Sequence, residues 1–550
     1  MSNDTVYRLL PEAILIVVAA LIYVVGAFFQ ARRVWAWVAV AALGLSAVAL
    51  FMQSAGGNVT IGDDGPAPAT TQVTSAGTLA LDAGGRIDAL GQYVRWLSLV
   101  VGLVLVLQSS RPDEDVQEPE MIGTLVLAVS GAMLAATTRD LVLLFLGIEL
   151  ISIPTYVLLY LGRRDAASPE AAAKYFFLSI LSSALTLYGF SFLYGIGGST
   201  DLAAVKSALA SQPDDPTGLT SLAVIALVLL FAGIGFKITA VPFHFYAPDV
   251  YQATTNGNAG VLAVLPKIAG FVVLVRIVAA AMPGMENYGW RIVLVIAVLT
   301  MTLGNVLGLW QDNIRRLLAY SSIAHSGYML IGLAVGLAAA AGGSQAATFD
   351  GIGALFFYLA VYALATAGTF AALTYLGGQG KQVDTVDELA GLARSNPLTA
   401  VFLAVFLFSL MGIPPLAGFW GKFGIFGSAL NFDEGGLADP QVRNWFLILA
   451  VIGVLNATIA AGYYLRVIAA IYFRPAQSTP QSAGGNGAAF AAGLCALLVV
   501  LVGLVPTPLV GQSSEAGVAL HSKESATVQR AANDRTVDDK LVTADATPAG

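Results

Sequence analysis

Long apolar stretches alternate with short polar connections along most of this chain. A helix needs about 20 apolar residues to cross the hydrocarbon core of a bilayer. Fourteen stretches meet that length, and they predict transmembrane helices at residues 11–30, 34–52, 89–108, 121–137, 139–161, 171–196, 220–253, 258–281, 289–310, 317–340, 352–377, 397–430, 442–472 and 486–510. The pattern therefore predicts an all-α membrane protein that crosses the bilayer about 14 times.

Two of these helices, the seventh (220–253) and the twelfth (397–430), are too long for one straight crossing. The seventh contains Pro242 and Pro248, and the twelfth contains Pro414 and Pro415. A proline inside a helix removes a backbone donor and clashes with the preceding turn, so we expect both helices to be broken. Irregular backbone at membrane depth is tolerated only inside protein or beside a water-filled cavity. Two broken helices therefore indicate an ion or substrate path.

A faint internal repeat suggests how the spans are grouped. Without gaps, residues 141–149 (LVLLFLGIE) align with residues 317–325 (LLAYSSIAH). The repeat predicts two five-helix units, spans 4–8 at about 121–281 and spans 9–13 at about 289–472, each with one broken helix. Because five is odd, the second unit starts on the opposite side of the membrane, which is the arrangement of inverted-repeat transporters.

The ends and the polar segments complete the predicted layout, in which residues 1–510 form one transmembrane domain. Arg32 and Arg33 follow the first apolar run, so this run is not a cleavable signal, and the positive-inside rule places the amino terminus outside. An even number of spans places the carboxyl terminus outside as well. We expect residues 53–88 to form an irregular outer loop and the polar residues 511–550 to form a disordered tail.

The composition excludes several classes of function. Hydrophobic residues make up 57% of the chain and charged residues only 11%, so a soluble enzyme is ruled out, because soluble domains carry about a quarter charged residues. The single cysteine, Cys495, excludes an internal disulfide framework, and no Cys-x-x-Cys pair is present to hold an iron–sulfur cluster. No phosphate-binding glycine motif is visible, and the net charge of −7 argues against nucleic acid.

Ionisable residues inside the predicted helices carry the strongest functional signal. Each costs about 2.5–3.5 kcal/mol at the bilayer centre, so it requires either a partner or a function. The candidates for proton transfer are Glu149, Lys174, Lys237, Lys267, Lys422, His244 and His325. Two histidines on different helices, without clustered acids or thiols, do not indicate a metal site.

All of these candidates except His325 also have a purely structural interpretation. Glu149 would form a fixed ion pair, and the lysines beside the breaks would extend their ammonium groups to the membrane surface. Lys267 would cap the helix beside Pro266, and Lys174, near the start of its helix, would reach the interface. His244 is interpreted equally well as a structural histidine in the break of the seventh span. We interpret Arg276, near the outer end of the eighth span, as extending to the surface.

Lysine chemistry suits a proton path. Removal from water favours the neutral amine, whereas a nearby carboxylate favours the ammonium form. Bringing a glutamate and a lysine together or apart therefore loads or unloads a proton. A row of such lysines, bridged by water and histidine, would pass charge along the bundle. An anion site would instead be expected to use arginine forks, and none is predicted at mid-span.

Five stretches, in order and at matching spacing, resemble the antiporter-like membrane subunits of respiratory complex I, the proton-pumping NADH:quinone oxidoreductase. They are FLGIELISIPTYVLLY (145–160), KITAVPFHFYAPDVYQ (237–252), PKIAGFVVLVR (266–276), RRLLAYSSIAHSGYMLIG (315–332) and GIPPLAGFWGKF (412–423). The resemblance is strongest to the subunit N branch, because Lys422 stands where the M branch usually has glutamate and the long lateral helix of the L branch is lacking. Residues 253–260 (ATTNGNAG) depart from the family's usual turn.

The resemblance implies a fourteen-helix fold with inverted repeats, and it implies roles for the candidates. Glu149 would pair with Lys237, Lys267 would be the central lysine, and Lys422 would end the path. His325 would lie in the second half-channel, and Lys174 matches the family's basic position in span 6. Quinone reduction elsewhere would change the Glu149–Lys237 separation, shift the Lys267 proton and release it at Lys422.

The resemblance also implies partners and a location. NADH, FMN, iron–sulfur clusters and quinone are expected on other subunits, with no cofactor in this chain. The expected partners are other complex I membrane subunits, including homologous antiporter-like ones, in a bacterial inner membrane. Three alternatives stay open: a subunit of a multisubunit sodium/proton antiporter, a structural scaffold with fixed ion pairs, and a free-standing solute transporter.

Overall fold

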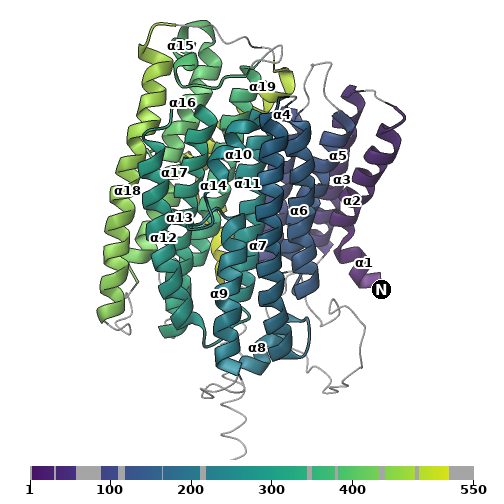
Figure 1. Ribbon diagram of the computed structural model, residues 1–550, viewed down its shortest axis with the longest axis vertical. Helices are drawn as coiled ribbons and strands as arrows, with labels where there is room; N and C mark the ends of the chain where they lie inside the picture. The colour runs from purple at the N-terminus through teal and green to yellow at the C-terminus, as the bar shows by residue number, and fades with distance from the viewer. Residues whose placement is uncertain are drawn as a thin grey trace, which may run out of the picture.

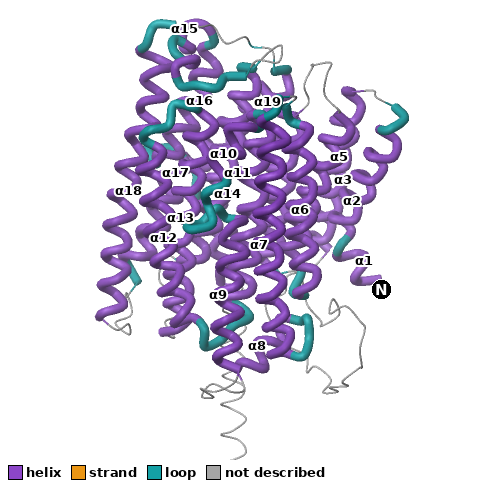
Figure 2. Tube along the Cα trace, viewed as in Figure 1, coloured by secondary structure: helices purple, strands orange, loops and turns teal. Residues whose placement is uncertain are grey.

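The protein is almost entirely helical in the computed structural model. The structure describes residues 3–29, 32–56, 88–109, 118–163, 165–210, 219–342, 350–377, 382–432, 440–476, 482 and 484–518. Within these ranges the only strand pairing consists of two isolated bridges, and Figure 2 shows helices joined by short loops. The prediction of an all-α protein is confirmed.

The helices follow one another along the chain with short connections. In order they are α1 (Asn3–Arg8), α2 (Leu10–Gly26), α3 (Arg32–Gly56), α4 (Ala89–Ser109), α5 (Glu118–Thr137), α6 (Leu141–Leu161), α7 (Ala167–Gly197), α8 (Leu202–Ala210), α9 (Leu219–Lys237), α10 (Ala247–Ala253), α11 (Asn256–Leu274), the π-helix η1 (Val275–Ala279), α12 (Glu286–Gly308), α13 (Ile314–Gly342), α14 (Gly351–Tyr375), the 3-10 helix η2 (Asp387–Leu389), α15 (Leu392–Ser395), α16 (Pro397–Met411), α17 (Ala417–Leu430), α18 (Pro440–Phe473) and α19 (Asn486–Leu504).

The long helices stand side by side in one bundle (Figure 1). Eleven of the described helices are long and apolar enough to cross a membrane, and three shorter apolar helices accompany them, namely Leu10–Gly26, Ser221–Lys237 and Pro397–Met411. These segments fall on the fourteen predicted spans. The amino terminus and α8 lie towards one end of the bundle, and α15 lies at the opposite end.

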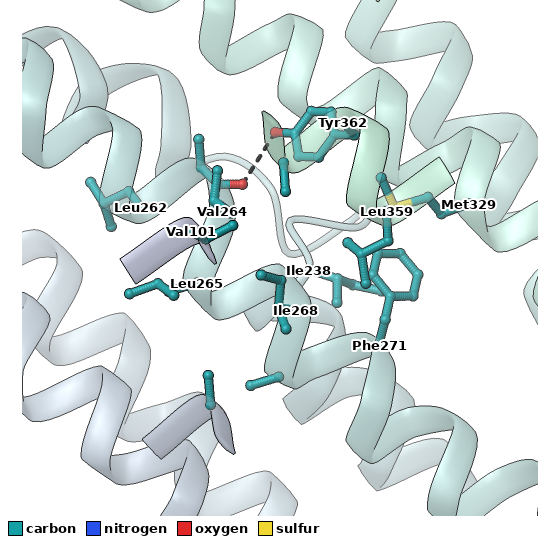
Figure 3. Close-up of a cluster of buried hydrophobic side chains, with 14 of the residues drawn as sticks. Val101, Ile238, Leu262, Val264, Leu265, Ile268, Phe271, Met329, Leu359 and Tyr362 are labelled. Atoms are coloured by element: carbon teal, nitrogen blue, oxygen red, sulfur yellow. Dashed lines mark hydrogen bonds between the residues drawn. The ribbon is translucent and has the colours of Figure 1, made fainter. Parts of the chain in front are cut away.

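The centre of the bundle lies around α11, which is buried along its whole length. Figure 3 shows apolar side chains from α4, α11, α13 and α14 meeting there, together with Ile238 from the break of the seventh span. The Tyr362 hydroxyl, drawn in the same view, donates a hydrogen bond to the carbonyl of Ala263 at 3.2 Å. Outer helices such as α7 and α18 instead leave large apolar side chains exposed, as expected for a surface that faces lipid.

Both predicted helix breaks are present. In the seventh span α9 ends at Lys237 and α10 begins at Ala247, so Pro242 lies in the break. Pro248 lies instead in the first turn of α10, where the missing N–H of proline has no helical partner to lose. In the twelfth span α16 ends at Met411 and α17 begins at Ala417, with the two prolines between them.

The two isolated bridges occupy equivalent places in the two predicted repeats. Asp140, just before α6, pairs with Asp201, and Asn313, just before α13, pairs with Thr385. In this register residue 149 corresponds to residue 322, so Glu149 matches Ser322. The ungapped alignment, which matched Glu149 with His325, is therefore wrong by about one helical turn, because runs of similar apolar residues align almost equally well in several registers.

The segments at the end of the chain differ from the prediction in one respect. The predicted disordered tail begins at residue 511, but residues 507–518 are helical. Ala516 in this helix is fully buried, and a side chain added at Gly517 would collide with the carboxylate of Asp350 at the start of α14. Residues 519–550 of the tail and residues 57–87 of the predicted loop lie outside the described residues.

Candidate functional site

Lys267 lies at the centre of the bundle, on the fully buried helix α11. Its side chain is 0% exposed, and its Nζ has four hydrogen-bond acceptors. Two come from the break of the seventh span, the Ile238 carbonyl at 3.2 Å and the Thr239 hydroxyl at 2.5 Å. Two come from α13, the Ser322 carbonyl at 2.9 Å and the Ser326 hydroxyl at 2.6 Å. All four are neutral oxygens.

Lys237 ends α9 at the break, and its side chain reaches α6 and α7. Its Nζ donates to the hydroxyl of Ser152 at 2.7 Å and to that of Ser179 at 2.8 Å. The residue is 4% exposed, so the lysine does not extend to the surface. Sequence reasoning did not identify these serines, because serine is unremarkable in a membrane helix until its neighbours are known.

Glu149 lies one turn from Ser152 on α6 and accepts a hydrogen bond from the hydroxyl of Ser183 at 2.5 Å. Ser179 and Ser183 are one turn apart on α7, so this helix presents one hydroxyl to the lysine and the next to the carboxylate. Glu149 is near enough to influence Lys237 electrostatically, but the described ion pairs do not include one between these two side chains. The structure therefore brings the predicted pair together as neighbours separated by hydroxyl groups.

His325 lies on α13, one residue before Ser326, and is 1% exposed. Its Nδ1 is 2.6 Å from the hydroxyl of Tyr358, and its Nε2 is 2.9 Å from that of Tyr464. These two tyrosines come from α14 and α18, and neither was identified from the sequence. A possible signal is the spacing of tyrosines one turn apart, since Tyr362 follows Tyr358, and its hydroxyl oxygen lies 2.8 Å from that of Ser322.

Lys422 lies on α17 and is 6% exposed. Its Nζ donates to the carbonyl of Met411 at 3.0 Å, at the end of α16, and lies 5.0 Å from the ring centroid of Tyr328. The side chain passes close to Gly412, which has a φ of 90°. A Cβ at position 412 would lie 2.9 Å from Cδ of Lys422. At the break of the twelfth span, Gly412 thus leaves space for the lysine side chain, and the Met411 carbonyl accepts its hydrogen bond.

The two other predicted site residues have no described hydrogen bond to the three buried lysines or to His325. Lys174 forms an ion pair with Glu170 at 2.7 Å, and its side chain is 50% exposed. It lines a pocket of about 430 Å³ with Arg163, Asp249 and Arg315. His244 lies in the break of the seventh span and is half-buried. Its Nδ1 has no hydrogen-bond partner among the described residues.

Two buried ion pairs were not predicted. Arg95 on α4 binds both carboxylate oxygens of Glu12 on α2, at 2.7 and 2.6 Å. Arg276, in the π-helix η1, binds both oxygens of Asp88, at 2.9 and 2.8 Å, and is 3% exposed. The interpretation of Arg276 as extending to the surface is therefore wrong, because Asp88 supplies a counter-charge from a segment distant in sequence.

The arrangement suits reversible proton binding. Three lysines are buried against hydroxyl and carbonyl oxygens, which stabilise an ammonium group without the fixed opposite charge of a carboxylate. Among the residues that the structure describes, no group of three or more His, Cys, Asp or Glu side chains could hold a metal ion.

The chain is similar to known membrane proteins over most of its length. The family described as "NADH:quinone oxidoreductase/Mrp antiporter, TM" matches residues 138–438. NADH-quinone oxidoreductase subunit N of Rhodospirillum rubrum is 35% identical over 83% of this chain and 87% of its own length. The subunit N 1 of Solibacter usitatus is 33% identical over 91% of this chain and 94% of its own length.

Solved structures agree with this similarity. A chain of respiratory complex I from Thermus thermophilus, solved with bound aureothin, is 29% identical and superposes with a TM-score of 0.70, covering 91% of this chain and 98% of that one. A chain of the Mrp complex from a Dietzia species superposes with a TM-score of 0.75 over 95% of this chain and 98% of its own, at 21% identity, and so shares the fold.

Proposed function

This chain belongs to the NADH:quinone oxidoreductase/Mrp antiporter family, among its NADH-quinone oxidoreductase N subunits, and we propose that its buried lysines carry protons across the membrane. The proposed path runs from Glu149 through Lys237, Lys267 and His325 to Lys422. The observation that carries the proposal is the burial of Lys267 among four neutral acceptors. A lysine fixed for structure alone would be expected to have a carboxylate partner, because an isolated buried charge is costly.

Shared contacts connect successive members of the path. Lys237 and Lys267 are connected by the break of the seventh span, where Ile238 and Thr239, the two residues after Lys237, contact Lys267. Lys267 and His325 meet on α13, because Ser322 and Ser326 flank the histidine. The remaining step runs beside Tyr328, whose ring contacts both His325 and Lys422.

We assign the driving reaction to other subunits. In this proposal quinone is reduced elsewhere in the complex, on subunits that carry NADH, FMN and iron–sulfur clusters, and this chain has no redox centre. The resulting change alters the separation of Glu149 and Lys237 and moves the proton of Lys267. The partners are the other membrane subunits, including homologous antiporter-like ones, in a bacterial inner membrane with both termini outside. We propose that Lys174 and His244 assist proton transfer from beside this path; Lys174 lines the charged pocket.

The test compares two lysines in the assembled complex. We expect Lys267→Met to lower the number of protons pumped per electron several-fold, because the variant removes the central proton-transfer group of the proposed path. Lys206→Met is the matched control, since this lysine lies on the short helix α8 at one end of the bundle. Proton uptake and quinone reduction would be measured together in membrane vesicles.

Unchanged pumping per electron in a fully assembled Lys267→Met complex would refute the proposal and favour a structural scaffold. Purification of the tagged chain, with mass spectrometry of its partners, tests the alternative of an antiporter subunit. Flavin- and cluster-bearing subunits would support the proposed complex, whereas small antiporter subunits alone would favour sodium/proton exchange.

A further inference from the structure

Residues 238 and 239 connect the two buried lysines, because they directly follow Lys237 and contact Lys267. Nζ of Lys237 is held by Ser152 and Ser179, on the side of Glu149. The next two residues turn the other way and present the Ile238 carbonyl and the Thr239 hydroxyl to Lys267. A displacement of residues 238 and 239 therefore reaches Lys237 through one or two peptide units.

The break lies directly against α11 at this point. Gly270 has no side chain, and a Cβ there would lie 2.6 Å from Cγ2 of Ile238. Gly270 thus leaves room for the side chain of Ile238 against α11, and a change in the bonds of Lys267, three residues before Gly270, acts on the break at short range.

Thr239 holds an unusual backbone conformation. Its φ is 56°, and it is the one residue other than glycine with a positive φ in the described part of the chain. A β-branched residue rarely adopts this left-handed region, whereas glycine adopts it readily. A strained conformation of this kind persists when the surroundings impose it, and an observed outlier of this kind supports a hypothesis of function. Here the side chain has a contact that glycine would lack, the hydrogen bond from Lys267.

The hydrogen bonds around Lys267 depend on its charge. A lysine ammonium has three donors and no acceptor, and it faces four oxygens. The Thr239 hydroxyl accepts from Nζ and donates its own hydrogen to the Ile238 carbonyl at 2.7 Å. Once the proton has left, the amine has two donors and a lone pair. The Thr239 hydroxyl can then turn its hydrogen to that lone pair, and the Ile238 carbonyl loses this donor.

We propose that Thr239 is a positioning residue that links the charge of Lys267 to the position of Lys237. With Lys267 charged, the break is held against α11 and α13, and Lys237 stays on the two serines. With Lys267 neutral, the Ile238 carbonyl is released and Lys237 moves towards Glu149. The inference rests on the proposed function and adds to it a residue that sets the order of the two proton transfers.

Three variants of Thr239 in the assembled complex test this link. Thr239→Ser keeps the hydroxyl, Thr239→Val keeps the shape without it, and Thr239→Gly removes the hydroxyl but adopts a positive φ without strain. We expect serine to retain most of the protons pumped per electron. Valine and glycine should both lower this ratio several-fold, even though the glycine variant assembles at least as well as the wild type.

If Thr239 only shaped the turn, the three variants would rank differently in the number of protons pumped per electron. Glycine would then pump as well as threonine, and serine would offer no advantage over valine; either result would overturn the inference. Lys267→Met is measured in parallel. If it pumps normally, the proposed function itself fails, whereas loss of pumping in Lys267→Met with normal pumping in Thr239→Gly refutes only the role of Thr239.

Discussion

Asp88 and Arg276 show how a single buried pair affects stability outside the proton path. Burial alone would raise the pKa of Asp88, but the charge and hydrogen bonds of Arg276 outweigh it and lower the pKa from 3.8 to about 2. A carboxylate with a lowered pKa stabilises the fold above its unfolded pKa, and this contribution is lost as the pH falls towards the folded value. The pair therefore stabilises the protein at neutral pH and ceases to do so between about pH 4 and pH 2.

We predict that Asp88→Asn destabilises the protein by about 3–5 kcal/mol at pH 7, because it leaves Arg276 buried without a counter-charge. Asp165→Asn is the control, since the Asp165–Arg163 pair is 41% and 30% exposed and such pairs contribute about 0–1 kcal/mol. Thermal unfolding in detergent would compare both variants with the wild type. An equal effect of the two substitutions would contradict the prediction, as would a difference between Asp88→Asn and wild type that grows at pH 3.

At this scale the sequence predicts the charged residues but not their partners. Lys237, Lys267 and Lys422 are visible because a lysine in an apolar run is conspicuous on its own. Their oxygen acceptors come from other spans, so no local pattern reveals them. Position along a predicted helix also fails to predict burial, for the same reason. Lys174 is half-exposed and Arg276 is buried, although both are close to the end of a predicted helix.

The broken helices are the elements that the sequence predicts best, because proline acts locally. The prolines do not predict which side chain each break binds. In the seventh span the break supplies two acceptors to Lys267, and in the twelfth it supplies one to Lys422. The register of the repeat is also missed, since it depends on the bridges Asp140–Asp201 and Asn313–Thr385, which join segments about 60–70 residues apart.

The break of the twelfth span leads to a prediction about Gly412. Gly412→Ala should lower the protons pumped per electron several-fold, because a Cβ there meets Cδ of Lys422 at 2.9 Å and the φ of 90° disfavours alanine. Gly424→Ala is the control on α17, where the added Cβ would meet its nearest neighbour at an ordinary 3.6 Å. Equal pumping by the two assembled variants would show that the position of Lys422 is not critical.

The two ends of the whole bundle differ in the segments they carry, with α8 at one end and α15 at the other. The distribution of arginine and lysine in the connections predicts that α15 faces the cytoplasm. The single cysteine, Cys495, is 0% exposed, so it should not compete with a cysteine introduced at the surface.

We therefore predict that Ser207→Cys, exposed on α8, reacts with a membrane-impermeant maleimide in intact cells. Ser395→Cys, exposed at the end of α15, should react only in inverted vesicles. Labelling would be read by mass shift of the purified chain, with the unsubstituted protein as the background. The opposite result would place both termini inside.

The complete burial of α11 has a consequence for how the protein is made. This helix enters the membrane before α13 and α14 have been synthesised, and Lys267 then costs about 2.5–3.5 kcal/mol in lipid. Two of its four acceptors lie 55 and 59 residues further along the chain. Until the second repeat is made, the lysine therefore has only the two acceptors from the seventh span. A chain interrupted between the two repeats would expose its central charge to lipid, and membrane quality control could recognise it by that charge.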